Sequence, residues 1–378
     1  MKKILFFIIV IVVAFAQSCR KDDTTEQSET QQDSSEIDDN YARLYVLNEG
    51  NMNENRSTLD DYDYATWTYT TNIYPSVNPS VVNGLGDVGN DLQIYGDKMY
   101  AVLNGSNKIE VMEATTAKRL GQIDLTNGRY ITFYQGFAYA SSYNRTITGT
   151  TDGDDNSANG IVVKIDTTTL KIVDSVTVGR QPDGVAIANG KLYVANSGGY
   201  SPSNYERIVS VIDLSTFEIV KSIDVAINLN LMQVDDEDNV YVSSRGDYLT
   251  VPSRLFKIDS QQDEVVDSFD FQVASFCVSK DTAYIVGKPF SGSSSYYYKT
   301  LATKSGTVLT DMFISDNTNS SIQLPYGILV NPESRNIYLT DAIDYQTSGN
   351  VYCFSPQGES VWEFKAGQIP GHLALLKK

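Results

Sequence analysis

One motif returns seven times along the chain and restricts its fold more than any other feature. A polar or glycine turn leads, within a residue or two, to a tyrosine and then to an alternating apolar stretch. Successive copies of the tyrosine are 39 to 55 residues apart, close to the roughly 40 to 50 residues of a four-stranded propeller blade. The seven tyrosines are Tyr45, Tyr100, Tyr139, Tyr193, Tyr241, Tyr284 and Tyr338.

Two further patterns complete the repeat. After the tyrosine, four segments each predict a strand, a polar hairpin turn and a second strand, namely 111–120, 164–173, 211–220 and 257–266. Before the tyrosine, short apolar segments such as 92–96 and 184–190 predict one more strand. Four strands per unit and almost no helical pattern predict an all-β fold, a seven-bladed β-propeller.

The two ends of the repeat array predict how the ring closes. The first unit begins with what should be its second strand, because no inner strand precedes Tyr45. The C-terminal segment 369–376 resembles 181–187, which opens the fourth unit. We therefore expect a C-terminal strand to complete blade one from the inside and so remove an open sheet edge.

The first residues have the pattern of a lipoprotein leader. Lys2 and Lys3 precede the apolar run 4–16, which is too short to span a bilayer, and small residues lead to Cys19. This pattern predicts a signal peptide over residues 1–18 and lipidation of Cys19, which would anchor the protein to a membrane by lipid alone.

An acidic segment follows the predicted lipidation site. Residues 20–40 contain one isoleucine and no aromatic residue, so we expect residues 19–40 to form a disordered tether. Its Lys21-Asp22-Asp23 string resembles the signal that sends Gram-negative lipoproteins to the outer face of the outer membrane. The sequence therefore predicts a propeller over residues 41–378, lipid-anchored in the outer membrane and facing the cell exterior.

Charge and residue types argue against several classes of function. The formal charge is −18, and removing Lys2 and Lys3 with the leader makes it −20, which disfavours nucleic acid as a partner. Cys277 and Cys353 lie in different repeats, so we interpret them as buried free thiols.

The chain also lacks the usual residues of catalysis. It has one histidine, His372, and no Gly-x-Ser-x-Gly motif, so we predict no catalytic residue, no metal site and no covalent cofactor. The acidic run 151–156 lacks the sixth-position glycine and the final glutamate of a calcium loop and is better interpreted as a surface loop. A calcium-dependent propeller hydrolase or lyase remains the enzymatic alternative, because its ligands would come from scattered blades.

The loops of one face carry the candidate ligand-binding residues. In a propeller, the loops from second to third strand and from blade to blade open on the same face around the axis. Here these loops are rich in asparagine, tyrosine, glycine and arginine, which suits a large polar ligand. Turn chemistry alone accounts for about half of the asparagines and glycines. The candidates are Asn90, Asn104, Arg129, Tyr130, Tyr143, Arg180, Gln181, Tyr200, Asn228, Arg245, Tyr248, Tyr326, Tyr345 and His372.

Two residue types among these candidates lead to sharper hypotheses. Arg129, Arg180 and Arg245 place three cations on one face of a very acidic protein, which suggests a ligand with an anionic or amide-rich part. His372 has three open interpretations: it coordinates cobalt, it donates a hydrogen bond to an amide, or it has a structural role in the closing strand.

A family resemblance is carried by strings distributed over the whole of residues 41–378. They include VLNEGN, LGDVGNDLQIYGDKMYAV, KLYVANSGGY, VSSRGDY, LPYGILVNPE and IPGHLALL. These strings and the leader resemble the YncE-like surface propeller lipoproteins that capture cobalamin (vitamin B12) and deliver it to a TonB-dependent outer-membrane transporter. The resemblance implies a seven-bladed propeller, tight binding of cobalamin or related corrinoids on one face, and association with that transporter.

The resemblance and the loops together favour a non-catalytic protein for cobalamin capture. A second hypothesis is a surface propeller that recruits a glycan, siderophore or peptide for another transporter, since related propellers can share the blade framework.

Overall fold

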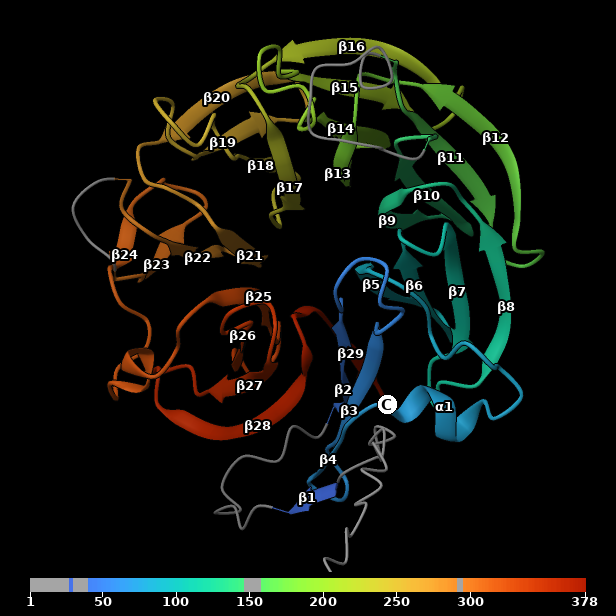
Figure 1. Ribbon diagram of the computed structural model, residues 1–378. Coiled ribbons are helices and arrows are strands. Elements are labelled where there is room, and N and C mark those ends of the chain that lie inside the picture. The colour runs from blue at the N-terminus through green and yellow to red at the C-terminus, as the bar shows by residue number, and fades with distance from the viewer. Residues whose placement is uncertain (1–26, 30–39, 146–157, 291–294) are drawn as a thin grey trace, which may run out of the picture.

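The computed structural model describes residues 27–29, 40–145, 158–290 and 295–378. Seven antiparallel sheets stand around one axis in the described part of the chain (Figure 1). The all-β, seven-bladed propeller predicted from the repeat is confirmed. Within the described residues, helix is limited to α1 (Ile73–Val77) and a 3₁₀ turn, η2 (Thr318–Ser320).

The strands follow the repeat. Blade one contains β1 (Gln27–Glu29), β2 (Tyr41–Asn48), β3 (Thr58–Asp63), β4 (Thr68–Thr70) and β29 (Pro370–Lys377). Blade two contains β5 (Gly89–Tyr95), β6 (Lys98–Leu103), β7 (Lys108–Glu113) and β8 (Arg119–Asp124), and blade three contains β9 (Gly128–Tyr134), β10 (Phe137–Ser142), β11 (Ile161–Asp166) and β12 (Lys171–Thr177). Blade four contains β13 (Pro182–Ala188), β14 (Lys191–Asn196), β15 (Ile208–Asp213) and β16 (Glu218–Asp224).

The remaining blades repeat the order. Blade five contains β17 (Leu229–Val234), β18 (Val240–Ser244), β19 (Arg254–Asp259) and β20 (Glu264–Phe269). Blade six contains β21 (Ser275–Ser279), β22 (Thr282–Gly287), β23 (Tyr297–Ala302) and β24 (Val308–Thr310). Blade seven contains β25 (Pro325–Val330), β26 (Ile337–Asp341), β27 (Ser348–Phe354) and β28 (Ser360–Gln368).

The ring closes within blade one, as predicted. Strand β29 pairs with β2 on the side opposite β3, so that Leu44 lies opposite Leu375 and Val46 opposite Leu373. In Figure 1, β29 completes the innermost circle together with β5, β9, β13, β17, β21 and β25. The last strand of the chain therefore completes the first blade, because it pairs with the inner edge of β2.

The outer edge of blade one contains a strand that the sequence did not predict. Gln27–Glu29, within the segment expected to be a disordered tether, pair with β4 as the outermost strand. Strand β4 has only three residues. Strand β1 covers the edge of β4 that would otherwise be free. The predicted lipidation site Cys19 and the acidic run 151–156 lie outside the described residues.

The hydrophobic core consists of layers between neighbouring blades, and the repeated tyrosines lie in these layers. All seven are at most 9% exposed. Hydroxyl groups of several of them reach the next blade: the Tyr45 hydroxyl donates to the Ala114 carbonyl at 2.7 Å, and the Tyr241 hydroxyl donates to the Thr303 carbonyl at 2.9 Å. The last blade meets the first through the Tyr338 and Tyr64 hydroxyls, 2.5 Å apart. The motif is therefore a contact between blades as well as a marker of strand position.

Candidate ligand-binding site

Irregular backbone pairing shapes one end of the propeller axis. We call this end the upper face; it carries the loops from second to third strand and from blade to blade. In six blades the pairing of the innermost strand shifts near this face, at β5, β9, β13, β17, β25 and β29. A bulge inserts an extra residue and redirects side chains.

The shifted positions carry the polar residues nearest the axis. In β9 the unpaired residues are Arg129 and Tyr130, and in β13 they are Asp183 and Gly184. Inner strands approach closely here, since a Cβ on Gly184 would stand 2.3 Å from the Asn230 carbonyl oxygen. Glycine is thus required where the neighbouring backbone approaches, and larger polar side chains occupy the positions beside it.

A cavity of about 500 Å³ occupies the axis below this face, and we call it the axial cavity. Its size falls within the range of small-molecule sites. Five of the predicted residues line it, namely Tyr130, Arg245, Tyr326, Tyr345 and His372. Polar residues outside the prediction line it as well: Glu49, Asp91, Gln93, Asn230, Gln233 and Tyr296.

A second cavity of about 560 Å³, the outer cavity, adjoins the first on the upper face. It lies between the loops of blades five, six and seven and is lined by the predicted residues Arg245, Tyr248 and Tyr345. Phe290 and Lys288 also line it. Tyr248 is 66% exposed and Phe290 46%, which is unusual for large aromatic side chains and suits contact with a ligand.

Two of the predicted arginines meet at one buried carboxylate. Arg129 Nε and Arg245 Nη1 lie 2.9 Å from Asp183 Oδ1 and Oδ2, respectively, and the Tyr143 hydroxyl donates to Oδ1 at 2.9 Å. Asp183 is fully buried, and although burial opposes its ionisation, the two arginines hold its pKa below the usual range. The Arg129 guanidinium also stands 4.9 Å from the Tyr143 ring centre. The cluster keeps one net positive charge beside the axial cavity.

The third arginine does not join this cluster. Arg180 Nε lies 2.9 Å from Glu206 Oε1, and its Nη2 donates to the Asn204 carbonyl at 2.6 Å. Arg180 therefore stands apart from the pair formed by Arg129 and Arg245, because a carboxylate in the long loop after β14 binds its guanidinium.

Other predicted residues support the loops behind the two cavities. The Asn90 side chain donates to the Arg129 carbonyl, Asn104 to Asn127, and Asn228 to the Gly246 carbonyl. Gln181 is 2% exposed and accepts from the backbone N–H of Tyr200, whose ring centre lies 6.1 Å from that of Tyr143. These amides hold the backbone in place, as turn chemistry predicts for such residues.

His372 lies at the upper end of β29 beside acidic groups. Its Nε2 atom is 3.3 Å from Glu49 Oε1, and its ring centre lies 6.4 Å from that of Tyr130. Burial raises the pKa of nearby Asp91, although His372 and the backbone N–H of Ile131 oppose that rise. Histidine, carboxylates and tyrosines thus offer donors and acceptors to a ligand in the axial cavity.

The sequence contained a signal for two of the missed residues, Glu49 and Lys288. Each stands four residues after a repeated tyrosine, at the top of the second strand, as do the predicted residues Tyr143 and Arg245. The position before them is regularly small or polar, whereas this position changes from blade to blade. Asp91, Asp183 and Asn230 gave no such signal, because the inner-strand bulges determine where they point.

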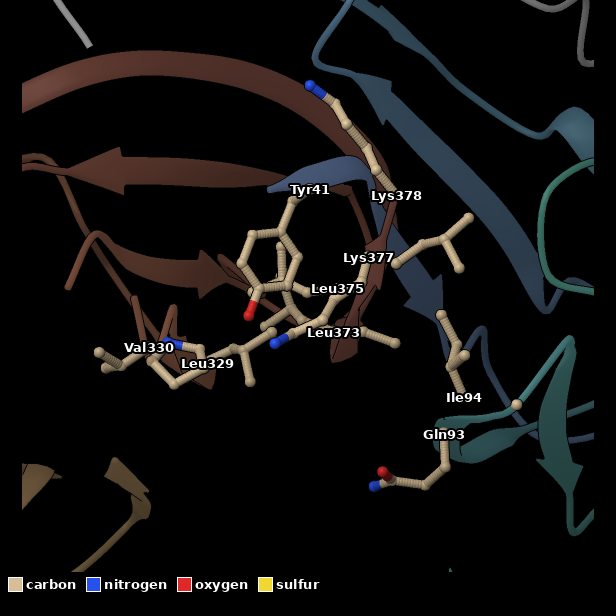
Figure 2. A pocket seen from close by; sticks show the side chains of 13 residues that line it. Tyr41, Gln93, Ile94, Leu329, Val330, Leu373, Leu375, Lys377 and Lys378 are labelled. Atoms are coloured by element: carbon tan, nitrogen blue, oxygen red, sulfur yellow. The ribbon is translucent and has the colours of Figure 1, made fainter. Parts of the chain in front are cut away.

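A third cavity lies at the opposite end of the axis, on the lower face. It is lined largely by apolar side chains from β29 and blade seven together with Lys377 and Lys378. Figure 2 shows Gln93 and Ile94 across the open space from Leu329 and Val330. Gln93, Leu329 and Leu373 line the axial cavity too. None of the predicted ligand-binding residues lines this lower cavity.

In the part of the chain that the structure describes, no group of three or more histidine, cysteine, aspartate or glutamate residues is arranged to hold a metal ion. No helix found there has the length and apolar character needed to cross a bilayer. Cys277 and Cys353 are buried free thiols, as predicted.

Seven blades, one of five strands and six of four, stand around an axis with a polar, aromatic cavity and define the chain as a seven-bladed β-propeller protein. Residues 43–367 match the model of the family described as Domain of unknown function (DUF5074), and the chain belongs to that family. No curated protein matches the chain in a sequence comparison.

Solved structures share the fold at low sequence identity. A quinonprotein alcohol dehydrogenase-like protein from Bacteroides thetaiotaomicron has a TM-score of 0.62 at 16% identity, covering 89% of this chain and 79% of that one. Hydrazine synthase from Kuenenia stuttgartiensis has a TM-score of 0.58 at 13% identity, covering 76% and 89%. Apo AztD from Citrobacter koseri has a TM-score of 0.52 at 10% identity, covering 90% and 99%. At these identities the similarity concerns the fold alone.

Proposed function

We propose that this chain is a non-catalytic capture protein that binds a corrinoid such as cobalamin at the upper face. The observation that carries the proposal is the pair of adjoining cavities at one end of the axis. Together they combine exposed aromatic side chains, amide side chains and a cluster with one net positive charge. Cobalamin has matching parts: a rigid disc, amide side chains and a phosphate-bearing nucleotide loop.

The resemblance to surface cobalamin-binding propellers supports the same ligand and adds a partner. On this proposal, Cys19 carries the lipid anchor in the outer membrane, and a TonB-dependent transporter receives the captured corrinoid. Binding requires no covalent cofactor and no catalytic residue. A glycan, siderophore or peptide bound in the same cavities would be the result expected under the second hypothesis.

Equilibrium titration of cyanocobalamin into the purified full-length protein tests the proposal. Strand β9 offers a matched pair of variants, because Tyr130 lines the axial cavity whereas Tyr134 lies at the other end of the same strand. We expect Tyr130→Ala to weaken binding by about 1 to 3 kcal/mol and Tyr134→Ala to leave it unchanged. Absence of binding by the unaltered protein, or equal losses in the two variants, would contradict the proposal.

A further inference from the structure

The axial and outer cavities adjoin each other, and four residues line both; we call these residues the shared wall. Asn230, Arg245, Ala274 and Tyr345 line both of them. One ligand can therefore occupy both cavities at once, with its middle part against this wall. Such a ligand contacts three regions, namely the outer cavity, the shared wall and the axial cavity, and each region suits a different chemical group.

The two cavities differ in character. The outer cavity presents Tyr248, Phe290 and Tyr345, which are between 43% and 66% exposed. Such side chains suit a planar, partly apolar group. The axial cavity presents Asp91, His372 and other polar groups, which suit a smaller group rich in hydrogen-bond donors and acceptors.

The shared wall carries a fixed cation. Among the described side chains, Arg245 forms its ion pair with Asp183 through Nη1, and a guanidinium has five N–H donors in all. Asp183 also accepts from Arg129 and Tyr143, so the carboxylate accepts hydrogen bonds from three side chains in all. Two arginines on one carboxylate leave a positive charge that a second anion would neutralise.

The wall also offers an acceptor without a partner. Asn230 is 9% exposed, and its Oδ1 atom has no hydrogen-bond partner in the described structure. A buried polar atom without a partner is costly, and a ligand N–H group would satisfy it. Arg245 and Asn230 thus present a cation and an acceptor side by side to the same part of a ligand.

We infer that Arg245 recognises an anionic group at the centre of the ligand, with Asp183 as its positioning residue. The planar part of the ligand occupies the outer cavity, and a smaller polar part enters the axial cavity. This inference rests on the proposed function; for cobalamin the anionic group is the phosphodiester of the nucleotide loop, and an amide of the corrin ring donates to Asn230.

A comparison of two ligands tests the inference. Dicyanocobinamide keeps the corrin ring and its amides but lacks the phosphate and the nucleotide, so it serves as the ligand without an anion. We expect Arg245→Ala in the full-length protein to weaken cyanocobalamin binding on the order of tenfold to a hundredfold, the loss of one charge-assisted hydrogen bond. Cobinamide binding should change by less than about threefold, within the effect of a solvent-exposed charge.

Arg180→Ala is the matched control, because Arg180 lies on the same face and is paired with Glu206. We expect it to leave the affinities for both ligands unchanged. If Arg245→Ala fails to fold, Arg245→Lys replaces it, since lysine keeps the charge but loses the planar fork. Its loss of affinity should again be confined to cyanocobalamin.

Asp183→Asn tests the positioning role. It should weaken cyanocobalamin selectively, as Arg245→Ala does, and the double variant should bind no more weakly than the Arg245 single variant. Equal losses for both ligands in the Arg245 or Asp183 variants would overturn the inference and leave corrinoid binding intact. Failure of the unaltered protein to bind either ligand would refute the proposed function itself.

Discussion

Tyrosine occurs in two regions of this propeller with opposite surroundings. The seven repeated tyrosines lie between blades and are at most 9% exposed, whereas Tyr248 and Tyr345 on the upper face are 66% and 43% exposed. The first group recurs at one position in every blade, whereas the position seven residues further on is tyrosine in only three blades, at Tyr200, Tyr248 and Tyr345. The comparison teaches that a residue type kept in every blade marks the framework, while positions whose residue type changes between blades supply the candidate site.

Removing the closing strand is expected to break the framework most severely. Deletion of residues 369–378 removes β29 and leaves β2 without its inner neighbour. We expect the midpoint of thermal unfolding to fall by at least about 10 °C. His372→Ala, which keeps the backbone of β29, is the control and should change the midpoint little. A deletion variant as stable as the full chain would show that closure contributes nothing.

Truncating one tyrosine from each region sharpens the comparison directly. Tyr241→Ala should lower the free energy of unfolding by about 3 to 5 kcal/mol, since it empties a packed layer between blades. Tyr345→Ala should lower it by much less, about 0.5 kcal/mol, because Tyr345 is 43% exposed and lies outside the layers between blades. Chemical denaturation measures both values. Similar losses would mean that the upper face is as much a part of the framework as the blades.

The charge cluster of the upper face is expected to have an intermediate effect. Asp183→Asn should destabilise the protein by about 2 kcal/mol at neutral pH, less than for a fully buried pair because both arginines keep some exposure. The pKa of Asp183 is lowered in the folded state, so its contribution is present above the unfolded pKa of about 4 and disappears as pH falls through the folded pKa. The difference between variant and wild type should therefore shrink below about pH 4. Denaturation at pH 7 and pH 3 checks this; a difference that grows in acid would contradict it.

Removal of single hydroxyl groups should give the smallest effects. Tyr241→Phe loses the hydrogen bond to the Thr303 carbonyl and should cost about 1 kcal/mol. Tyr345→Phe should leave the free energy of unfolding unchanged. A null result for Tyr241→Phe would assign the stabilising role of the repeated tyrosines to their rings alone.

The framework was predictable because each blade repeats the same pattern. The tyrosine register located every second strand, and the similarity of 369–376 to 181–187 predicted the closure by β29. Loop position also placed Tyr130, Arg245, Tyr326, Tyr345 and His372 at the axial cavity. These predictions depend on topology, which the repeat determines.

The finer arrangement of the site was not predictable from the pattern. Asp183 was missed because a bulge in β13 turns it toward two arginines from other blades, and nothing in its neighbours along the chain indicates this. The pairing of Arg180 with Glu206, 26 residues later, was not indicated either. Both cases concern pairing between segments that are distant in sequence, where each partner alone looks like a surface charge.

The closure inside blade one leaves Asn40 and Lys378 in contact, with the Lys378 backbone N–H donating to the Asn40 carbonyl at 3.0 Å. They meet at the lower end of β2, and Glu49 of the axial cavity follows the upper end of that strand. A short linker between them would turn the propeller into a continuous ring that can be reopened in another loop, because circular permutation is tolerated where chain ends are adjacent. If the ring were opened in a loop of the upper face, any segment joined to the new N-terminus would be attached beside the cavities. The propeller would then present its ligand in the reversed orientation relative to that segment.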